Sequence, residues 1–540
     1  MTCYLPIDRY NILVEFAVKH MDFQRAELES VLDLYGIKLH SPDCQILPLP
    51  SPTTERTRPF LMLSFPCELK GPRFHLEEEE ATNSNEQESI ASILSRCILV
   101  RSVIELWGIG TTIEDCVDCS KQWKESCLGK EIFGKHSDSS KSWKLTIHTL
   151  GSTFTRQEQN DMRLNFKFFD FKGPVKMKEP TSEYIMIREV ELSSLGSAVY
   201  PRQDCSKKTI PENEARPPLA VYFGRILGQG RATKGRGDVE RYSLKKRNYL
   251  GPTSMDAELS FIMSNLGQVE KGKYVMDPFV GTGSILLSCA IRGAYCIGTD
   301  IDIRVLRGRN EHENIRSNFA QFGLPRPELV RSDNAMYNRH YRRSAVPLYD
   351  SIVTDPPYGI RAGARRSGSR SENPKPVVEE WRHNHIAQTK PYAVEDVMAD
   401  LLDMAARTLV MGGRLVYVIP SFSAEFSVEN DLPQHTCLEF IHSCYQPFSP
   451  ELGRRIVTMK KMKAYEETRQ NEYLAVVWKN GAESAEKCAN IRDKLLEAAK
   501  KKPRYEEKLA IRKEKRKKTK DAKKRAKLEH NSDSNIDKNQ

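Results

Sequence analysis

The sequence predicts an α/β protein in which an α+β N-terminal region is followed by a Rossmann-like domain. Strand and helix patterns alternate from residue 218 to about residue 480, as they do in parallel sheets covered by helices. Within that stretch, a short apolar segment ends in a glycine turn that leads straight into a helical pattern. A second apolar segment then ends in an acidic residue about 20 positions after the turn, which is the spacing of nucleotide-binding sheets.

The N-terminal region, residues 1–200, carries the periods of both strands and helices. Apolar residues at helical spacing predict helices at residues 22–35 and 88–103. Short apolar runs predict strands at residues 11–18, 60–66, 143–149 and 184–190. This mixture indicates a separate α+β domain.

Composition divides the rest of the chain. Residues 201–217 are polar and contain prolines, which is typical of a linker; residues 218–480 hold the Rossmann-like domain, and residues 481–540 form a Lys-rich, flexible tail. The 540 residues carry a formal net charge of +11, yet residues 491–530 alone hold 18 Lys and Arg against 7 Asp and Glu. The folded body is therefore nearly neutral, and any basic binding face on it must be local.

The glycine turn contains Asp277, Gly281 and Gly283, and it is the first indication of a ligand-binding site in the sequence. Glycines let a backbone approach a ligand closely, and the helix that follows offers free N–H groups. Leu286 occupies the third glycine position of a dinucleotide fingerprint. The turn alone therefore leaves a NAD-dependent dehydrogenase open beside enzymes that use another adenosine cofactor.

Acidic residues follow the next predicted strands. Asp300 ends the segment 295–300 where a carboxylate could accept hydrogen bonds from the ribose hydroxyls of a cofactor, and Asp302 is the second choice. Asp333 follows another predicted strand, where it could accept from an adenine amine or simply cap a helix.

The decisive segment is Asp355-Pro356-Pro357-Tyr358, which directly follows the apolar run 349–354. Two prolines make a rigid turn that presents carbonyls instead of N–H groups. The Asp355 carboxylate and the Pro356 carbonyl could both accept from an exocyclic amine and aim its lone pair at a methyl donor. Tyr358 offers a face on which an extruded base could stack. A dehydrogenase would leave this segment without a purpose.

The sequences of these motifs resemble those of one family of class I amino-methyltransferases. Its members are the THUMP-containing enzymes that methylate N2 of guanosine 10 in eukaryotic tRNA. The resemblance is specific from about residue 221 to residue 358 and looser in the N-terminal region, where residues 164–177 and 184–190 are similar to the closing strands of a THUMP domain. The segments that carry it are YSLKKR (242–247), GPTSMDA (251–257), DPFVGTGS (277–284), GTDID (298–302), ENIRSN (313–318) and TDPPYGIR (354–361).

The resemblance implies S-adenosyl-L-methionine as cofactor, tRNA as substrate and a small zinc-binding activator subunit as partner. It also implies residue roles: Asp277, Gly281 and Gly283 at the cofactor turn, Asp300 at the ribose, Asp333 at the adenine, Thr253 and Ser254 at the methionine end, and Asp355, Pro356, Pro357 and Tyr358 at the amine. Two readings stay open beside this one. They are an adenine-N6 methyltransferase acting on RNA or DNA, and an RNA-binding module with a vestigial methyltransferase fold.

Three further features bear on partners and compartment. The arginines of residues 361–370 could hold RNA phosphates beside the base. Cys116 and Cys119, with Cys127 and His136 nearby, lack the second close pair of a structural zinc site, so no metal site is expected. With 13 cysteines, no signal peptide in the first residues and no long apolar segment, we expect a soluble, cytoplasmic protein with reduced thiols.

Overall fold

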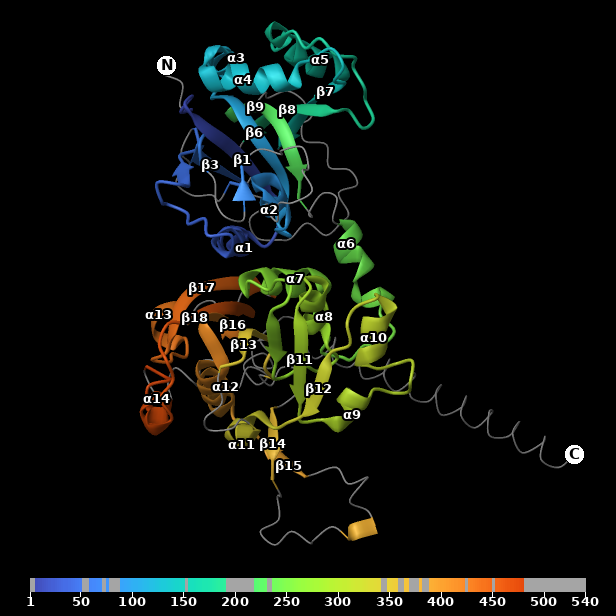
Figure 1. Cartoon of the computed structure of the whole chain (residues 1–540), viewed down its shortest axis with the longest axis vertical. Coiled ribbons are helices and arrows are strands. Elements are labelled where there is room, and N and C mark those ends of the chain that lie inside the picture. The colour runs from blue at the N-terminus through green and yellow to red at the C-terminus, as the bar shows by residue number, and fades with distance from the viewer. Residues whose placement is uncertain are drawn as a thin grey trace, which may run out of the picture.

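The computed structural model contains two seven-stranded sheets, each with its own helices (Figure 1). It describes residues 5–50, 58–69, 74–76, 88–150, 154–190, 218–230, 236–340, 347–357, 364–368, 378–380, 388–422, 426–448 and 452–479. The predicted linker and the Lys-rich tail lie outside these residues.

The N-terminal sheet has the strand order β2-β3-β1-β6-β9-β8-β7. Its pairs are antiparallel except for β7 and β8, which run parallel. The strands are β1 (Arg9–Phe16), β2 (Gln45–Leu47), β3 (Phe60–Pro66), β6 (Val100–Gly110), β7 (Trp143–Leu150), β8 (Ser182–Val190) and β9 (Pro218–Gln229); the short β4 (Phe74–His75) and β5 (Glu88–Ser89) pair separately.

Five helices in the described ranges accompany this sheet, and an aromatic cluster packs the helix that contains Trp123 against it. Trp107 of β6 stacks on Trp123 with ring centroids 4.5 Å apart, and Phe169, Tyr184 and Phe223 surround the pair. Such packing buries a large apolar area per residue. The helices are α1 (Met21–Leu34), α2 (Ile90–Ser95), α3 (Ile113–Glu125), α4 (Cys127–His136) and α5 (Arg156–Leu164).

Two expectations for this domain are wrong. The helix expected at 88–103 ends at Ser95, and its last residues begin β6 instead. Because β6 is buried on both faces, its apolar run lacks the alternation that marks a strand. Residues 164–177 form no long strand: they contain a 3₁₀ helix, Lys167–Phe169, whose aromatic side chains fill the core.

Strand β9 sets the domain boundary later than expected. It lies between β6 and β8 in the N-terminal sheet, although the sequence placed residue 218 at the start of the Rossmann-like domain. An apolar strand after a linker carries no local sign of the sheet it joins. The N-terminal domain therefore extends through Gln229.

The second sheet is Rossmann-like, with the strand order β12-β11-β10-β13-β16-β18-β17. Its first five strands run parallel, whereas β18 pairs antiparallel with both β16 and β17. Its strands are β10 (Tyr274–Asp277), β11 (Tyr295–Asp300), β12 (Glu328–Arg331), β13 (Tyr349–Thr354), β16 (Leu409–Phe422), β17 (Leu438–Pro447) and β18 (Leu452–Lys461); β14 (Arg365–Ser367) and β15 (Thr389–Pro391) form a small hairpin-like pair.

Helices cover both faces of this sheet. Val275 of β10 belongs to the apolar cluster that contains α8, whereas its neighbour Met276 belongs to the cluster that contains α12. Adjacent strand residues point to opposite faces, so the two helices lie on opposite sides. The helices of this domain are α6 (Arg236–Arg241), α7 (Ala257–Leu266), α8 (Ser284–Ile291), α9 (Ile303–Arg307), α10 (Ile315–Gln321), α11 (Tyr337–His340), α12 (Val394–Thr408), α13 (Val428–Asp431) and α14 (Gln470–Ala475). None of the helices in the described ranges is long and apolar enough to span a bilayer.

The two domains contact each other through α1, α7 and β17 (Figure 1). The fully buried Glu27 carboxylate of α1 accepts a hydrogen bond from the Asn265 side chain of α7 over 2.7 Å. Arg414 of β16 donates to Asp33 of α1 over 2.8 Å. Arg414 pairs with Ser351 near the start of β13, so the N-terminal domain docks away from the end of β13 that leads into Asp355.

Candidate active site

A cavity of about 1140 Å³ opens at the carboxyl ends of the parallel strands β10, β11 and β13. The chain leaves β10 for β11 and β12 on one side, and β13 and β16 lie on the other. Such a reversal of strand order separates the loops above the sheet and is the usual ligand position in open α/β folds. The site predicted from sequence therefore lies where the topology places a ligand.

The glycine turn forms the floor of this cavity. Gly281 and Gly283 have φ values of +50° and +77°, which favour glycine over residues with a Cβ. A Cβ added at Gly281 would meet only the Phe279 carbonyl oxygen, 3.9 Å away, so the space above the turn is open. At Gly283, which caps α8, a Cβ would lie 2.7 Å from the Ile315 side chain. Gly281 thus serves ligand access, and Gly283 serves packing.

Asp300 lies at the end of β11 and lines the cavity. Its carboxylate accepts from the backbone N–H of Gly281 over 3.0 Å and of Asp302 over 2.8 Å. Burial raises its pKa. The Asp302 side chain instead caps α9 and pairs with Arg304, which lowers the pKa of Asp302. Asp300 is therefore the better placed of the two acids for a ribose.

Asp333 also lines the cavity, but its carboxylate already has two backbone partners. It caps a 3₁₀ helix by accepting from Ala335 N over 3.0 Å, and it accepts from Ser367 N over 2.6 Å. Ser367 belongs to β14, so Asp333 joins the end of β12 to the segment that follows Asp355-Pro356-Pro357-Tyr358 in the chain. The capping alternative is observed, and a further bond to an adenine amine stays a prediction.

Asp277 ties the glycine turn to β13. Its buried carboxylate accepts from Phe279 N over 3.0 Å and from the Thr354 hydroxyl over 2.6 Å. Burial, together with the nearby carboxylates of Asp355 and Asp300, raises the pKa of Asp277 to about 7. Asp277 lines the cavity, and its hydrogen bonds brace the turn.

The predicted catalytic turn faces the same cavity. Asp355, Pro356 and Pro357 all line it, and Asp355 is half-buried at the end of β13. Tyr358 lies outside the described residues. The first three residues of the predicted turn thus border the cavity, as amine chemistry there would require.

Thr253 and Ser254 border the cavity from a segment that precedes α7. The Ser254 hydroxyl lies 2.7 Å from the Thr282 hydroxyl of the glycine turn and accepts from Gly251 N over 3.0 Å. Nine of the predicted residues therefore line one cavity: Thr253, Ser254, Asp277, Gly281, Asp300, Asp333, Asp355, Pro356 and Pro357.

Other lining residues have no motif in the sequence. Tyr392 comes from the segment after β15, and Phe448 and Arg454 come from the ends of β17 and β18. The Arg454 guanidinium lies 5.2 Å from the centre of the Phe448 ring, which is 54% exposed. An exposed aromatic ring with a cation over it suits a nucleic-acid base and its phosphate. Tyr249 and Arg309 also line the cavity, and Tyr249 lies between the quoted motifs that end at residue 247 and begin at residue 251.

These residues fit an adenosine cofactor. The open turn at Gly281 leaves room for close approach, Asp300 supplies an acceptor at ribose spacing, and the cavity is large enough for a cofactor and a base.

The cysteine cluster offers no comparable site. Cys116 is a buried free thiol on α3, and burial raises its pKa, whereas Cys119 is disulfide-bonded, contrary to the expectation of reduced thiols throughout. Among the described residues, no group of three or more His, Cys, Asp or Glu side chains is arranged to hold a metal ion.

Comparison with known proteins gives a consistent picture. The family described as Tmrp11 THUMP N-terminal domain matches residues 81–231, and the RMKL-like methyltransferase domain matches residues 245–371. The human tRNA (guanine(10)-N(2))-methyltransferase TRMT11 is 35% identical over 88% of this chain and 92% of its own length. The Dictyostelium discoideum TRMT11 is 35% identical over 86% of this chain and 84% of its own length. The chain belongs to the TRMT11 family.

Membership of the TRMT11 family confirms the resemblance seen in the motifs and the predicted fold class. The THUMP match ends at residue 231 and the methyltransferase match begins at residue 245, in agreement with the placement of β9 in the N-terminal domain. Among solved structures, TrmN from Thermus thermophilus is 14% identical and covers 84% of this chain and all of its own, with a TM-score of 0.36.

Proposed function

We propose that this protein transfers a methyl group from S-adenosyl-L-methionine to the exocyclic N2 amine of guanosine 10 in tRNA. The observation that carries the proposal is the position of Asp355 and Pro356 in the cavity that also holds the strand-end carboxylate of Asp300. One cavity then brings an amine acceptor site and a cofactor site together. The TRMT11 relatives carry this activity in their names.

The residues of this chain would act by positioning and polarisation. Asp300 would accept from the ribose hydroxyls, and Thr253 and Ser254 would border the methionine end, where the sulfonium supplies the methyl group. The Asp355 carboxylate and the Pro356 carbonyl would accept from the two N–H bonds of guanine N2. Those bonds would turn the nitrogen lone pair toward the methyl group. The methylated nitrogen then loses one proton, for which Asp355 is an adjacent acceptor.

The N-terminal domain would bind the tRNA. This domain matches the THUMP family and is docked on α7 and β17. It would therefore hold the RNA at a fixed place relative to the catalytic cavity. At the cavity mouth, Phe448 would face the extruded base and Arg454 a phosphate.

We further propose a small zinc-binding activator as partner and the cytoplasm as location. Support for the activator comes from the family resemblance and from apolar side chains along one side of the second sheet. Tyr295 of β11 and Val330 of the edge strand β12 are 56% and 53% exposed. Exposed apolar side chains beside an edge strand suit a protein partner.

The test is transfer of labelled methyl groups to total tRNA by the full-length chain, with and without the co-expressed activator. Label should appear in N2-methylguanosine and should vanish when guanosine 10 is replaced in a tRNA transcript. Asp355→Ala should cut transfer by a factor on the order of 10² or more while cofactor binding stays near normal. Label in N6-methyladenosine would instead support an adenine-N6 methyltransferase. Bound cofactor without any transfer, with the activator present, would contradict the proposal.

A further inference from the structure

The segment 247–256, here called the strap, crosses one side of the cofactor cavity without helical or strand structure. Eight consecutive strap residues, Tyr249 to Asp256, line the cavity. Backbone N–H and C=O groups away from water need partners, and a segment without secondary structure must find them elsewhere. The source of those partners decides how rigid this wall is.

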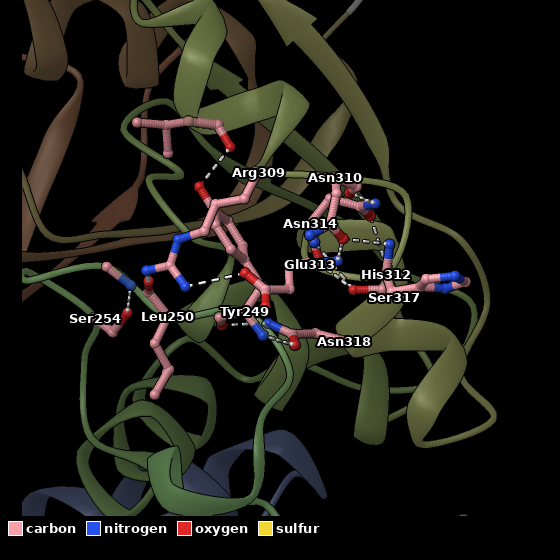
Figure 2. Close-up of polar contacts among 12 residues, drawn as sticks. Tyr249, Leu250, Ser254, Arg309, Asn310, His312, Glu313, Asn314, Ser317 and Asn318 are labelled. Carbon is pink, nitrogen blue, oxygen red and sulfur yellow. Dashed lines mark hydrogen bonds and ion pairs between the residues drawn. The ribbon is translucent and has the colours of Figure 1, made fainter. Parts of the chain in front are cut away.

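Helix α10 supplies them through two side-chain amides. Asn318 accepts from Tyr249 N over 2.9 Å and donates to Tyr249 O over 2.8 Å (Figure 2). Gln321, one turn later, accepts from Asn248 N over 3.2 Å and donates to Lys246 O over 2.6 Å. The Asn318 amide therefore satisfies both backbone groups of one residue, as a neighbouring strand would.

Burial makes the Asn318 contact the stronger of the two. Asn318 is 2% exposed, whereas Gln321 lies at the surface. A buried backbone group that loses its partner costs the full desolvation penalty, while an exposed one turns to water. Removal of Asn318 would leave two unpaired groups on Tyr249, and the strap would have to move to satisfy them.

The other side of the strap is held by the residues around α9. The Tyr249 hydroxyl donates to Val305 O over 3.0 Å. Arg309 donates to Leu250 O over 3.2 Å, and Figure 2 labels both of these residues. Glu313 pairs with Arg309 over 3.1 Å and keeps the guanidinium in place. Tyr249 is thus fixed through both its backbone and its side chain.

Helix α10 is itself joined to the glycine turn. Asn314 and Ser317 form a capping box that fixes its first turn. Its first residue, Ile315, packs so closely against Gly283 that a Cβ there would lie 2.7 Å from the Ile315 side chain. At the far end of the strap, Ser254 contacts Thr282 of the same glycine turn. The strap, α10 and the glycine turn therefore form a closed ring of contacts.

We infer that Asn318 is a positioning residue for the cofactor: it holds the strap at the distance from the glycine turn that the bound cofactor requires. This inference rests on the proposed function for the identity of the cofactor. Because the strap is already ordered before binding, less conformational entropy is lost when the cofactor binds. Loss of Asn318 therefore weakens cofactor affinity more than it slows the chemical step.

The experiment compares Asn318→Leu and Asn318→Asp with the wild-type, full-length chain. Leu removes both hydrogen bonds and keeps the branched shape and the number of side-chain heavy atoms, and Asp retains the acceptor for Tyr249 N. Calorimetry should show the Kd for S-adenosyl-L-methionine raised ~10-fold or more in Asn318→Leu and less in Asn318→Asp. In methyl transfer, the KM for the cofactor should rise by a larger factor than kcat falls.

Asn11→Ala is the matched control. Asn11 is also buried and donates to two backbone carbonyls, of Pro6 and Arg9, but it lies in the N-terminal domain. It should lower thermal stability and leave the cofactor Kd unchanged. A folded Asn318→Leu variant with wild-type Kd would overturn the inference.

Amide hydrogen exchange separates this inference from the proposed function. Tyr249 N–H should exchange faster in Asn318→Leu than in the wild type, whatever ligand the cavity binds, and Asn318→Asp should stay closer to the wild type because it keeps the acceptor. Failure of the wild type to bind S-adenosyl-L-methionine would count against the proposed function, and exchange at Tyr249 would still decide the role of Asn318. Unchanged exchange there would overturn it.

Discussion

Thr354 donates its hydroxyl to the Asp277 carboxylate over 2.6 Å, and both side chains are buried. Thr354 is the residue before Asp355, and Asp277 opens the glycine turn. This hydrogen bond thus joins the glycine turn to the turn that begins at Asp355. In the proposed reaction, the relative position of cofactor and amine would depend on this contact.

We predict that Thr354→Val lowers kcat by ~10-fold, because it removes the donor and leaves a buried carboxylate short of one partner. The valine retains the shape of threonine, so folding should persist. Single-turnover kinetics at saturating cofactor measure the effect. Thr354→Ser keeps the hydroxyl and should remain within about threefold of the wild type; an equal loss in both variants would point to packing instead.

Asp277→Asn should make stability less dependent on pH. An acid whose pKa is raised in the fold stabilises the folded state while it is protonated. This contribution is complete below the unfolded pKa of about 4 and is lost as pH rises through about 7. Asparagine keeps the Oδ1 acceptor for Thr354 and Phe279 but cannot ionise.

Urea unfolding of the cofactor-free protein at pH 5, 6, 7 and 8 measures this difference. Relative to the wild type, the free energy of unfolding of the variant should rise by about 3 kcal/mol between pH 5 and pH 8. Parallel curves for the two proteins would show that Asp277 does not titrate with the raised pKa.

Asp300→Asn should weaken cofactor binding by ~10-fold or more, because the amide replaces one acceptor with a donor at the ribose. Asp302→Asn is the control, since Asp302 is held by Arg304 and caps α9. It should change the Kd by less than about threefold. Comparable losses in both variants would mean that the two acids share the ribose.

We predict that the two residues of the Asp33–Arg414 ion pair at the domain interface contribute unequally to stability. Asp33→Ala should destabilise the protein by about 3 kcal/mol, because it leaves the Arg414 cation, whose side chain is 4% exposed, without its carboxylate. Arg414→Met should cost less, about 1 kcal/mol, since the Asp33 side chain is 30% exposed and can turn to water. Denaturant unfolding of both variants measures the difference, and an equal or reversed cost would contradict it.

The sequence could predict which acidic residues line the cavity because these residues lie directly at strand ends. Asp277, Asp300, Asp333 and Asp355 each belong to a local strand-to-loop pattern, and the sheet then brings the ends of its parallel strands together.

Features that depend on contacts between distant segments could not be predicted in this way. Strand β9 looks like any apolar strand, and only its pairing with β6 and β8 assigns it to the N-terminal sheet. Phe448 and Arg454 reach the cavity because β17 and β18 return beside β16, and no local pattern records that path. The prediction of a helix at 88–103 was wrong because β6 is buried on both faces, so its sequence lacks the alternation of apolar and polar residues that marks a strand.

The docking of the N-terminal domain away from the catalytic end of β13 has a genetic consequence. Substitutions at Asp355 leave every described contact between the domains intact, so a catalytically dead chain would keep its RNA-binding surface. Such a chain would compete with its active counterpart for the same tRNA. In a cell that carries both alleles, inactivating changes in the catalytic turn would therefore act as dominant inhibitors, whereas changes that unfold the N-terminal domain would behave as recessive losses.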